Sequence, residues 1–443
     1  MKDHLTVVGA GLAGSEAAWQ AAECGIPVVL YEMRPVNPTP VHKTQFCAEL
    51  VCSNSMGANQ PNAAPYILKE ELRRLNSLII ACADEFAVPA GAALAVDRDL
   101  FSAAITRKLE NHPNITLKRE EVDEIPEEGP VIIATGPLTS PRLSDSISRL
   151  IGQEYLYFYD AISPIVDAST IDYDKAFFAS RYNKGDADYL NCPLNKEQYL
   201  ALVQELKSSN KVPLQPFEKP IYFEGCMPVE ELALRGDQTL AFGPMKPVGL
   251  PIPGTGEIAH AVVQLRHENL EGTAFNMVGF QTKLTYPEQK RVFRMIPGME
   301  NAEFFRLGAI HRNTFINAPS LLTRELDLKS KPGLYFAGQI IGVEGYVEST
   351  AMGALAALSA VKKMQNGKYQ PPPGDTALGS LINYLSKQDG GKFQPMNINY
   401  GLFLVPEMKV KNKQLRNEKI AKNALASLDA WLGDYKSNIG SAA

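Results

Sequence analysis

The sequence has no long apolar run, no CxxC cysteine pair and no excess of positive charge, and each absence excludes a class of protein. The longest apolar stretches, such as Leu78–Ala83 and Val131–Ala134, are too short to cross a bilayer, so we expect no membrane contact. The 44 basic and 49 acidic residues give a net charge of −5, which provides no global attraction for nucleic acid. Six cysteines in 443 residues, and a strand predicted almost at the N-terminus instead of a signal peptide, indicate free thiols in a reducing cytoplasm.

The first 32 residues predict one strand–helix–strand unit. Leu5–Val8 is a short apolar strand, the alanine-rich segment Ser15–Glu23 favours a helix, and Pro27–Tyr31 is the second strand. The glycine-rich turn Gly9–Gly14 lies between the first strand and the helix, and Glu32 follows the second strand. A GxGxxG pattern in this context, with an acidic residue about 20 positions later, is typical of dinucleotide-binding folds.

Each residue type of this unit has a physical role in binding a dinucleotide. Gly9 permits the tight turn, Gly11 lets the backbone approach a pyrophosphate at the helix N-terminus, and Gly14 lets the helix pack on the strand. Glu32 is expected to accept hydrogen bonds from the adenosine ribose. The remaining cofactor contacts expected in this turn are Val8, Ala10, Leu12 and Ala13.

Two later segments favour FAD over NAD. Ala134-Thr135-Gly136 follows a buried strand, where two-dinucleotide-fold flavoproteins often return to the cofactor. Gly338-Gln339 opens the segment between the strand Gly333–Gly338 and a small-residue helix expected over Ser349–Met364. The N-terminus of that helix, with Glu348 and Ser349, could stabilise negative charge on a reduced flavin ring.

The composition along the chain predicts an α/β fold: a Rossmann-like FAD-binding domain of the glutathione-reductase type with an inserted α+β domain. Residues 1–155 and 301–370 form the discontinuous FAD-binding domain in this prediction. Residues 156–300, which have short alternating runs and few long helical patterns, form the inserted substrate domain. Residues 371–443 form a C-terminal helical segment that packs on the FAD-binding domain, with a helix expected over Leu415–Trp431.

The cysteines raise two hypotheses. Cys47 and Cys52 have the spacing of the redox pair of flavin disulfide reductases, but the sequence lacks both a second GxGxxG unit for NADPH and the glycines that flank such a pair. Cys52 is followed by the polar pair Ser53-Asn54, in a loop expected to pass the flavin. Cys226 lies in a Gly- and Pro-bounded turn, where a thiol can act as a nucleophile. Most free cysteines are buried small hydrophobes, which is the interpretation we favour for Cys24, Cys47, Cys82 and Cys192.

Nearly the whole chain resembles the TrmFO family of folate- and FAD-dependent tRNA (uracil-5-)-methyltransferases, which is related to the MnmG flavoproteins. The blocks that carry the resemblance are Val8–Gly14, Glu32–Pro35 with Arg34, Val51–Ser55, Ala134–Pro137, Tyr189–Pro193, Phe223–Glu231, Phe242–Gly249, Gly279–Thr282, His311–Thr314 and Ala337–Ser349.

The resemblance implies that Cys52 and Cys226 are the catalytic pair and that Arg34 is among the cofactor contacts. It implies methylation of carbon 5 of a uridine in the tRNA T-loop, forming ribothymidine, with 5,10-methylenetetrahydrofolate as carbon donor. Reduced FAD, replenished by NAD(P)H, would supply the hydride. Addition of a thiolate to carbon 6 makes carbon 5 nucleophilic, and we assign that role to Cys226, although the roles of the two thiols could be exchanged.

A tRNA substrate requires local basic patches on this acidic chain. Six basic residues in the segment 407–422 form one candidate, and Arg291, Arg294, Arg306 and Arg312 form a second, with His311-Arg312 expected at the mouth of the active site. A ribosomal RNA uridine, an MnmG-like wobble-uridine modification with a partner protein, and a flavin oxidoreductase without RNA remain alternatives. The histidines show no metal-ligand spacing, so we expect no metal, and we predict no obligate protein partner.

Overall fold

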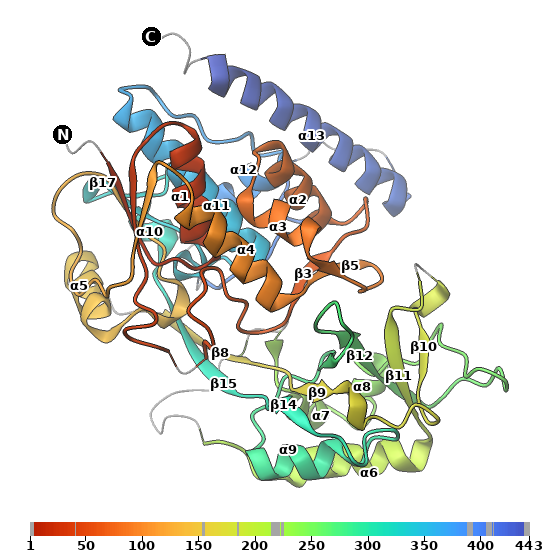
Figure 1. The fold of residues 1–443 in the computed structure, drawn as a ribbon. Helices are drawn as coiled ribbons and strands as arrows, with labels where there is room; N and C mark the ends of the chain where they lie inside the picture. Colours follow the sequence, from red (N-terminus) through yellow and green to blue (C-terminus); the bar gives the residue numbers. More distant parts are fainter. Residues whose placement is uncertain are drawn as a thin grey trace.

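The computed structural model describes residues 4–39, 41–152, 156–183, 186–213, 222, 226–387, 393–404, 410 and 412–437. Two bodies lie one above the other, joined by a narrow pair of strands (Figure 1). The upper body, called the core domain here, contains the N-terminal unit and the C-terminal helices. The lower body is built from the middle of the chain and is called the inserted domain.

A six-stranded sheet forms the centre of the core domain. Its strands are, in spatial order, β16 (Asp327–Leu328), β17 (Lys331–Phe336), β7 (Val131–Ile133), β1 (Leu5–Val8), β2 (Val28–Tyr31) and β6 (Ile115–Lys118). All neighbours pair in parallel except β16 and β17. The strands β1 and β7 are completely buried, which explains why each is a continuous apolar run in the sequence. The predicted α/β fold class is confirmed.

The helix α1 (Leu12–Glu23) packs directly against α11 (Tyr346–Met364). The contact is a backbone contact, because a Cβ placed on Gly353 of α11 would lie 2.1 Å from the carbonyl oxygen of Ala13. The helix α11 begins three residues earlier than expected, at Tyr346, after Gly345 with a φ of 122°.

The segment from Ala64 to Glu85 forms two helices separated by a short turn. Asn76 adopts a φ of 55°, which ends the first helix, and the Ser77 hydroxyl caps the second by accepting from the backbone N–H of Ile80. The helices of this part of the core domain are α2 (Ala64–Arg74), α3 (Leu78–Glu85), α4 (Arg98–Glu110) and α5 (Pro141–Ile151). A small sheet of β3 (Ser55–Ala58), β5 (Ala93–Val96) and β4 (Ala87–Val88) lies beside them.

The inserted domain has its own sheet and its own hydrophobic core. The strands are, in spatial order, β10 (Phe177–Ala179), β11 (Tyr189–Leu194), β12 (Ala261–His267), β13 (Ala274–Met277), β9 (Ile165–Asp167) and β14 (Phe304–Arg306). The helices are α6 (Lys196–Ser208), α7 (Val229–Leu234), α8 (Thr239–Phe242) and α9 (Tyr286–Phe293). The longest of them, α6, lies beside α9 on the outer side of the sheet (Figure 1).

Two antiparallel strands, β8 (Leu156–Ala161) and β15 (Ile310–Phe315), carry the chain between the domains. Ala302 and Phe304 pack in the core of the inserted domain, whereas Ile316 packs in the core of the first. We therefore propose the two-domain division expected from the sequence, with the return crossing placed in β15 instead of at residue 301.

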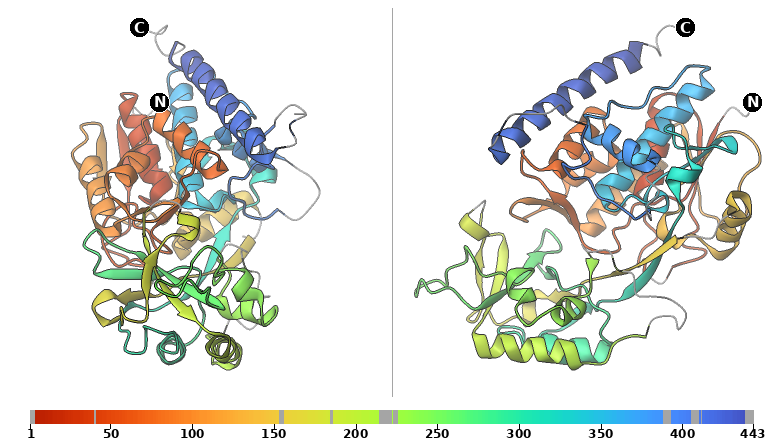
Figure 2. Two further views of the ribbon diagram at one scale, coloured as in Figure 1. Left: turned by 90° about the vertical axis from the view of Figure 1, so that its right-hand side faces the viewer. Right: turned by 180° about the vertical axis from the view of Figure 1, so that it is seen from behind.

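The C-terminal segment packs on the core domain. After α10 (Ala318–Leu321) and α12 (Ala377–Ser386), the helix α13 (Lys413–Ser437) lies across the outer face, next to α2 (Figure 2). The indole N–H of Trp431 donates to the carbonyl of Gln370 at 2.8 Å, and Leu428 and Trp431 join the first hydrophobic core. Across the described ranges, no helix combines the length and apolar character that a membrane crossing requires.

We expect Gly353→Ala to destabilise the protein by about 1–3 kcal/mol, since its methyl group would force α1 and α11 apart. Thermal unfolding of the purified protein measures the effect. Gly433→Ala is the matched control, because a Cβ at Gly433 of α13 meets no atom within 4 Å and alanine favours a helix. Equal melting temperatures for the two variants would contradict the close packing of α1 on α11.

Candidate active site

The three glycines of the glycine-rich turn have two different roles, close packing and an open backbone. A Cβ on Gly9, whose φ is 97°, would lie 2.7 Å from the carbonyl oxygen of Ala134, and one on Gly14 would lie 1.8 Å from that of Gly9. These two positions must be glycine for β1, β7 and α1 to pack. A Cβ on Gly11, by contrast, would meet no atom of the described residues within 4 Å. Gly11 caps the N-terminus of α1 and leaves its backbone open to a ligand.

Glu32 lies at the end of β2, beside this turn. Its carboxylate accepts from the backbone N–H of Ala10 at 3.1 Å and from Nε of Arg34 at 2.8 Å. Arg34 also contacts Glu49 at 3.1 Å. Burial acts to raise the pKa of Glu32, but the hydrogen bond and charge of Arg34 outweigh it and hold that pKa below its usual value. An ionised carboxylate therefore faces the turn, with lone pairs left for a ribose hydroxyl.

A first cavity of about 1060 Å³ runs over the turn and the carboxyl ends of the strands, the usual ligand position in open α/β sheets. His42 also lines this cavity. The residues expected from the sequence to bind the cofactor that line this cavity are Val8, Gly9, Gly11, Leu12, Ala13, Glu32, Arg34, Thr135, Gly136, Gly338, Gln339 and Ser349.

A second cavity of about 1340 Å³ continues from the first, because both are lined by Val51, Pro137, Leu138, Gln339, Tyr346 and Ser349. Ser53 and Glu348 line the second cavity. Asn54 lines neither: it is completely buried, and its side chain donates to the carbonyls of Val96 and His267 and accepts from Arg266. The assignment of Asn54 to the cofactor is therefore not supported, because its polar atoms are used where the two domains meet.

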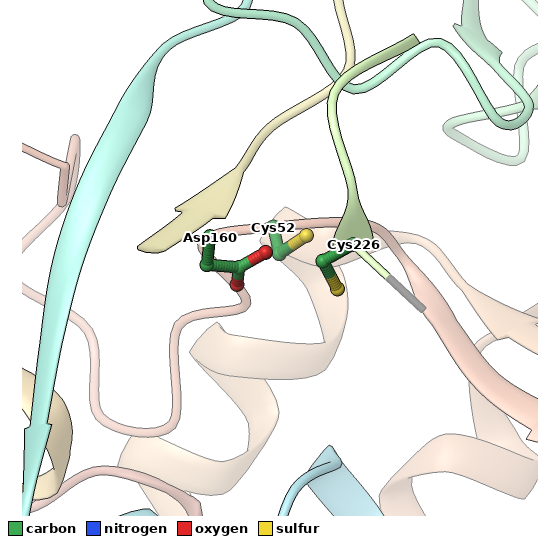
Figure 3. A group of neighbouring side chains, drawn as sticks. All are labelled: Cys52, Asp160 and Cys226. Carbon is green, nitrogen blue, oxygen red and sulfur yellow. The ribbon is translucent and has the colours of Figure 1, made fainter. Parts of the chain in front are cut away.

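The two candidate catalytic cysteines meet in the second cavity. Cys52 comes from the loop before β3 and Cys226 from the segment before α7, yet their sulfur atoms and a carboxylate oxygen of Asp160 on β8 all lie within 4.8 Å of one another. Figure 3 shows the Asp160 carboxylate directed at the two thiols. The neighbours of Cys226 at 223–225, which belong to the family-like block, lie outside the described residues.

Three residues from distant elements hold the Cys52 loop. The hydroxyl of Tyr346, at the start of α11, accepts from the backbone N–H of Cys52 at 2.8 Å. Arg98 of α4 donates to the carbonyl of Cys52 at 3.1 Å, and Arg306 of β14 donates to that of Val51. The loop carrying the first thiol is thus fixed by the core domain and the inserted domain together.

Four titratable groups of this cavity, Cys226, Asp160, Glu344 and His311, have pKa values shifted in favour of their neutral forms. The hydrogen bond with Cys52, burial and the charge of Asp160 all raise the pKa of Cys226 well above its usual value. Burial raises the pKa of Asp160 to about 6. Burial, together with the nearby Asp160, raises the pKa of Glu344 well above its usual range. Burial and Arg306 lower the pKa of His311 to about 4. Such perturbed groups in one cleft are typical of active sites.

The structure adds residues that the sequence did not reveal. Asp160 and Glu344 line the second cavity with Gln281 and Asn313. Glu344, Gln281 and Asn313 fall inside family-like blocks and could have been singled out there, whereas Asp160 lies in a strand with no motif. His311, expected at the mouth of the site, lines the same cavity.

The other cysteines lie away from this chemistry. Cys47, Cys82 and Cys192 are completely buried, as expected for small hydrophobic residues, while Cys24 is partly exposed. Burial raises the pKa of Cys47 to about 11, which leaves it a poor partner for redox exchange with Cys52.

The two sets of basic residues that the sequence suggested as RNA contacts lie in different surroundings. Arg291 pairs with Glu205 and Glu288, and Arg294 pairs with Glu303, so these two charges are compensated on the surface. Arg306 lies instead beside the Cys52 loop, and the side chain of Arg312 is not among those described. In the C-terminal group, 407, 409 and 411 lie outside the described residues; the remaining basic side chains, all exposed on α13, are Lys413, Arg416, Lys419 and Lys422.

Comparison with known proteins agrees with this geometry. Residues 4–368 match the family described as "Glucose inhibited division protein A". A protein of Natranaerobius thermophilus named "Methylenetetrahydrofolate--tRNA-(uracil-5-)-methyltransferase TrmFO" is 56% identical over 97% of this chain and 99% of its own length. A protein of the same name from Enterococcus faecalis is 55% identical over 96% and 98% of the two chains. Aquifex aeolicus GidA superposes with a TM-score of 0.68 at 18% identity, covering 96% of this chain and 74% of its own.

The sheet topology, the glycine-rich turn and the two connected cavities define an FAD-binding fold of the GidA type. The chain belongs to the GidA family and, within it, to the TrmFO proteins, since its curated relatives are identical at more than half of their positions over nearly their whole length.

We expect Gly11→Ala to fold normally but to lose FAD, because the added methyl group would project into the first cavity without touching protein. Flavin absorbance of the purified protein, together with its thermal unfolding, measures the two effects separately. Gly433→Ala, in α13, is the control for substitution of an unstrained glycine outside the cavity. A Gly11→Ala protein with a full complement of flavin would mean that the first cavity does not hold the pyrophosphate.

Proposed function

We propose that this protein methylates carbon 5 of a uridine in the tRNA T-loop, forming ribothymidine, with 5,10-methylenetetrahydrofolate as carbon donor. The observation that carries the proposal is the meeting of Cys52, Cys226 and Asp160 in a cavity continuous with the dinucleotide cavity. The names of the curated relatives support folate, tRNA and uracil carbon 5. The six free cysteines agree with a reducing cytoplasm as its location.

The first cavity fits FAD. The open backbone at Gly11 would receive the pyrophosphate, the ionised Glu32 would bind the adenosine ribose, and the N-terminus of α11 would lie near the flavin ring. When bound and reduced by NAD(P)H, FAD supplies the hydride that turns the transferred one-carbon unit into a methyl group.

The residues of the second cavity prepare the uracil ring. Cys226 adds to carbon 6, which makes carbon 5 nucleophilic towards the one-carbon donor. Cys52 lies close enough to exchange a proton with Cys226 and is held beside the flavin side of the cavity by Tyr346. Gln281 and Asn313 offer amide groups for the polar edge of the base.

Alternative substrates use the same site. A ribosomal RNA uridine would need the same thiol chemistry, and an MnmG-like wobble-uridine reaction would need a partner protein. The decisive experiment incubates the yellow protein with a mixture of unmodified tRNA and unmodified ribosomal RNA, labelled methylenetetrahydrofolate and NADPH, and locates the label. Labelled 5-methyluridine in the T-loop supports the proposal, whereas label only in ribosomal RNA or at the wobble position contradicts it.

We expect Cys226→Ala and Cys52→Ala each to abolish methylation while the protein keeps its fold. Since Cys226 is outside the first cavity, its variant should retain FAD with an unchanged spectrum, whereas Cys52→Ala should perturb the spectrum through its loop. tRNA containing 5-fluorouridine should form a denaturation-resistant adduct with the wild type and none with Cys226→Ala. Cys82→Ala is the control. An adduct that persists in Cys226→Ala but vanishes in Cys52→Ala would reverse the two roles.

Replacing Lys413, Lys419 and Lys422 by glutamine should weaken tRNA binding, because these lysines are exposed on α13. The log–log dependence of affinity on salt should flatten by up to about 0.7–0.9 for each phosphate that the variant no longer neutralises. Filter binding over a range of salt concentrations measures the slope. Glu418→Gln, on the same helix, removes a negative charge and should not flatten it. An unchanged slope in the triple variant would mean that α13 does not contact RNA.

A further inference from the structure

Asp160 lies beside the two thiols, but the thiol chemistry described above gives it no role. It lies on β8, one of the two strands that join the domains, and is paired in register with His311 of β15. The thiol of Cys226, the backbone of Ala161 and the side chain of Asn313 all hydrogen-bond to its carboxyl group. Its oxygen Oδ1 is buried and has no hydrogen-bond partner at standard distance within the described structure. A buried carboxylate oxygen without such a partner is costly, so its retention in a cavity indicates a function there.

We propose that Asp160 is the general base that accepts the proton of Cys226 as its sulfur adds to carbon 6 of the uracil ring. This inference rests on the proposed function. In the step, the S–H bond breaks and its proton moves to the Asp160 carboxylate, while a bond forms between Sγ and carbon 6. The electron pair of the carbon 5–carbon 6 double bond moves towards oxygen 4 and gives the enolate, so no oxidant or reductant is required.

The resting state of Cys226 makes a base necessary. Its pKa is raised by Cys52, burial and Asp160, so the thiol is neutral near neutral pH and a neutral thiol is a weak nucleophile. Asp160, with a pKa of about 6, is ionised under the same conditions and has the basicity suited to a general base near neutral pH. The proton must therefore leave during the attack instead of before it.

Among the titratable groups near Cys226, Asp160 is the strongest candidate for the general base. Burial and the charge of Asp160 raise the pKa of Glu344 well above its usual value, so Glu344 is the protonated member of this carboxyl pair. His311 is a weak base, since its pKa is lowered to about 4. The other titratable groups lining this cavity are Cys52, Tyr346 and Glu348, and the charge of Arg306 lies close to His311.

The test uses FAD-loaded Asp160→Asn, Asp160→Glu and the control Asp167→Asn, which removes a carboxylate from the same domain but keeps the cap on Ser169. Two reactions of Cys226 are compared: alkylation by iodoacetamide without tRNA, followed by mass spectrometry, and adduct formation with 5-fluorouridine-containing tRNA over a range of pH. Flavin content and thermal unfolding are recorded for each variant.

The two reactions should respond to Asp160→Asn in opposite directions. Alkylation at pH 8 should be faster, because loss of the negative charge lowers the pKa of Cys226. Adduct formation should be about 100-fold slower or more, because the proton acceptor is gone. The wild-type adduct rate should fall as the pH drops through about 6, and this limb should disappear in Asp160→Asn. Asp160→Glu should recover part of the rate, and Asp167→Asn should resemble the wild type.

Three outcomes would overturn the role of Asp160. The first is an Asp160→Asn variant that forms the adduct as fast as the wild type, and the second is one in which both alkylation and adduct formation are faster. The third is a wild-type adduct rate that does not fall as the pH drops through about 6. If Asp160→Asn does not fold, the wild-type profile and Asp160→Glu decide, and an Asp160→Glu rate at the background level counts against the proposal. A wild-type protein that forms no adduct contradicts the proposed function itself.

Discussion

The backbone contact between α1 and α11 is the constraint on which both cavities depend. Gly353 lets α11 approach the carbonyl of Ala13, and Gly14 lets α1 approach the carbonyl of Gly9. These contacts place the first turn of α11 beside the glycine-rich turn. Tyr346, in the first turn of α11, then holds the backbone of Cys52 through a hydrogen bond. The cofactor cavity and the position of the first thiol therefore follow from one tightly packed pair of helices.

The second constraint is the polar contact between the domains. Arg98 of the core domain pairs with Glu268 of the inserted domain and donates to the carbonyl of Leu50. Burying such a pair costs desolvation, so its net contribution to stability is small, but removal of one partner would leave a buried charge. The pair, together with Asn54 and Arg266, sets the orientation of the domains and hence the distance between Cys52 and Cys226.

The second cavity combines Cys226 and Glu344, whose raised pKa values keep them neutral, with Asp160, whose pKa of about 6 leaves it ionised at neutral pH. Burial and mutual repulsion raise the pKa values of Cys226 and Glu344. With Cys226 and Glu344 neutral, the cavity would accept an uncharged pyrimidine at a lower desolvation cost than a cavity in which all these groups were charged. The raised pKa also keeps Cys226 in its less reactive thiol form at neutral pH.

The sequence by itself determined the dinucleotide unit, since the spacing of Gly9, Gly11, Gly14 and Glu32 is a local property of one strand–turn–helix segment. It predicted Cys52 and Cys226 as a catalytic pair only through resemblance, because the two lie 174 positions apart and no local pattern links them. Only the folded structure shows that Asp160 joins the thiols and that Asn54 makes its hydrogen bonds where the two domains meet. Such placements depend on the packing of distant strands, which the pattern of a single segment does not encode.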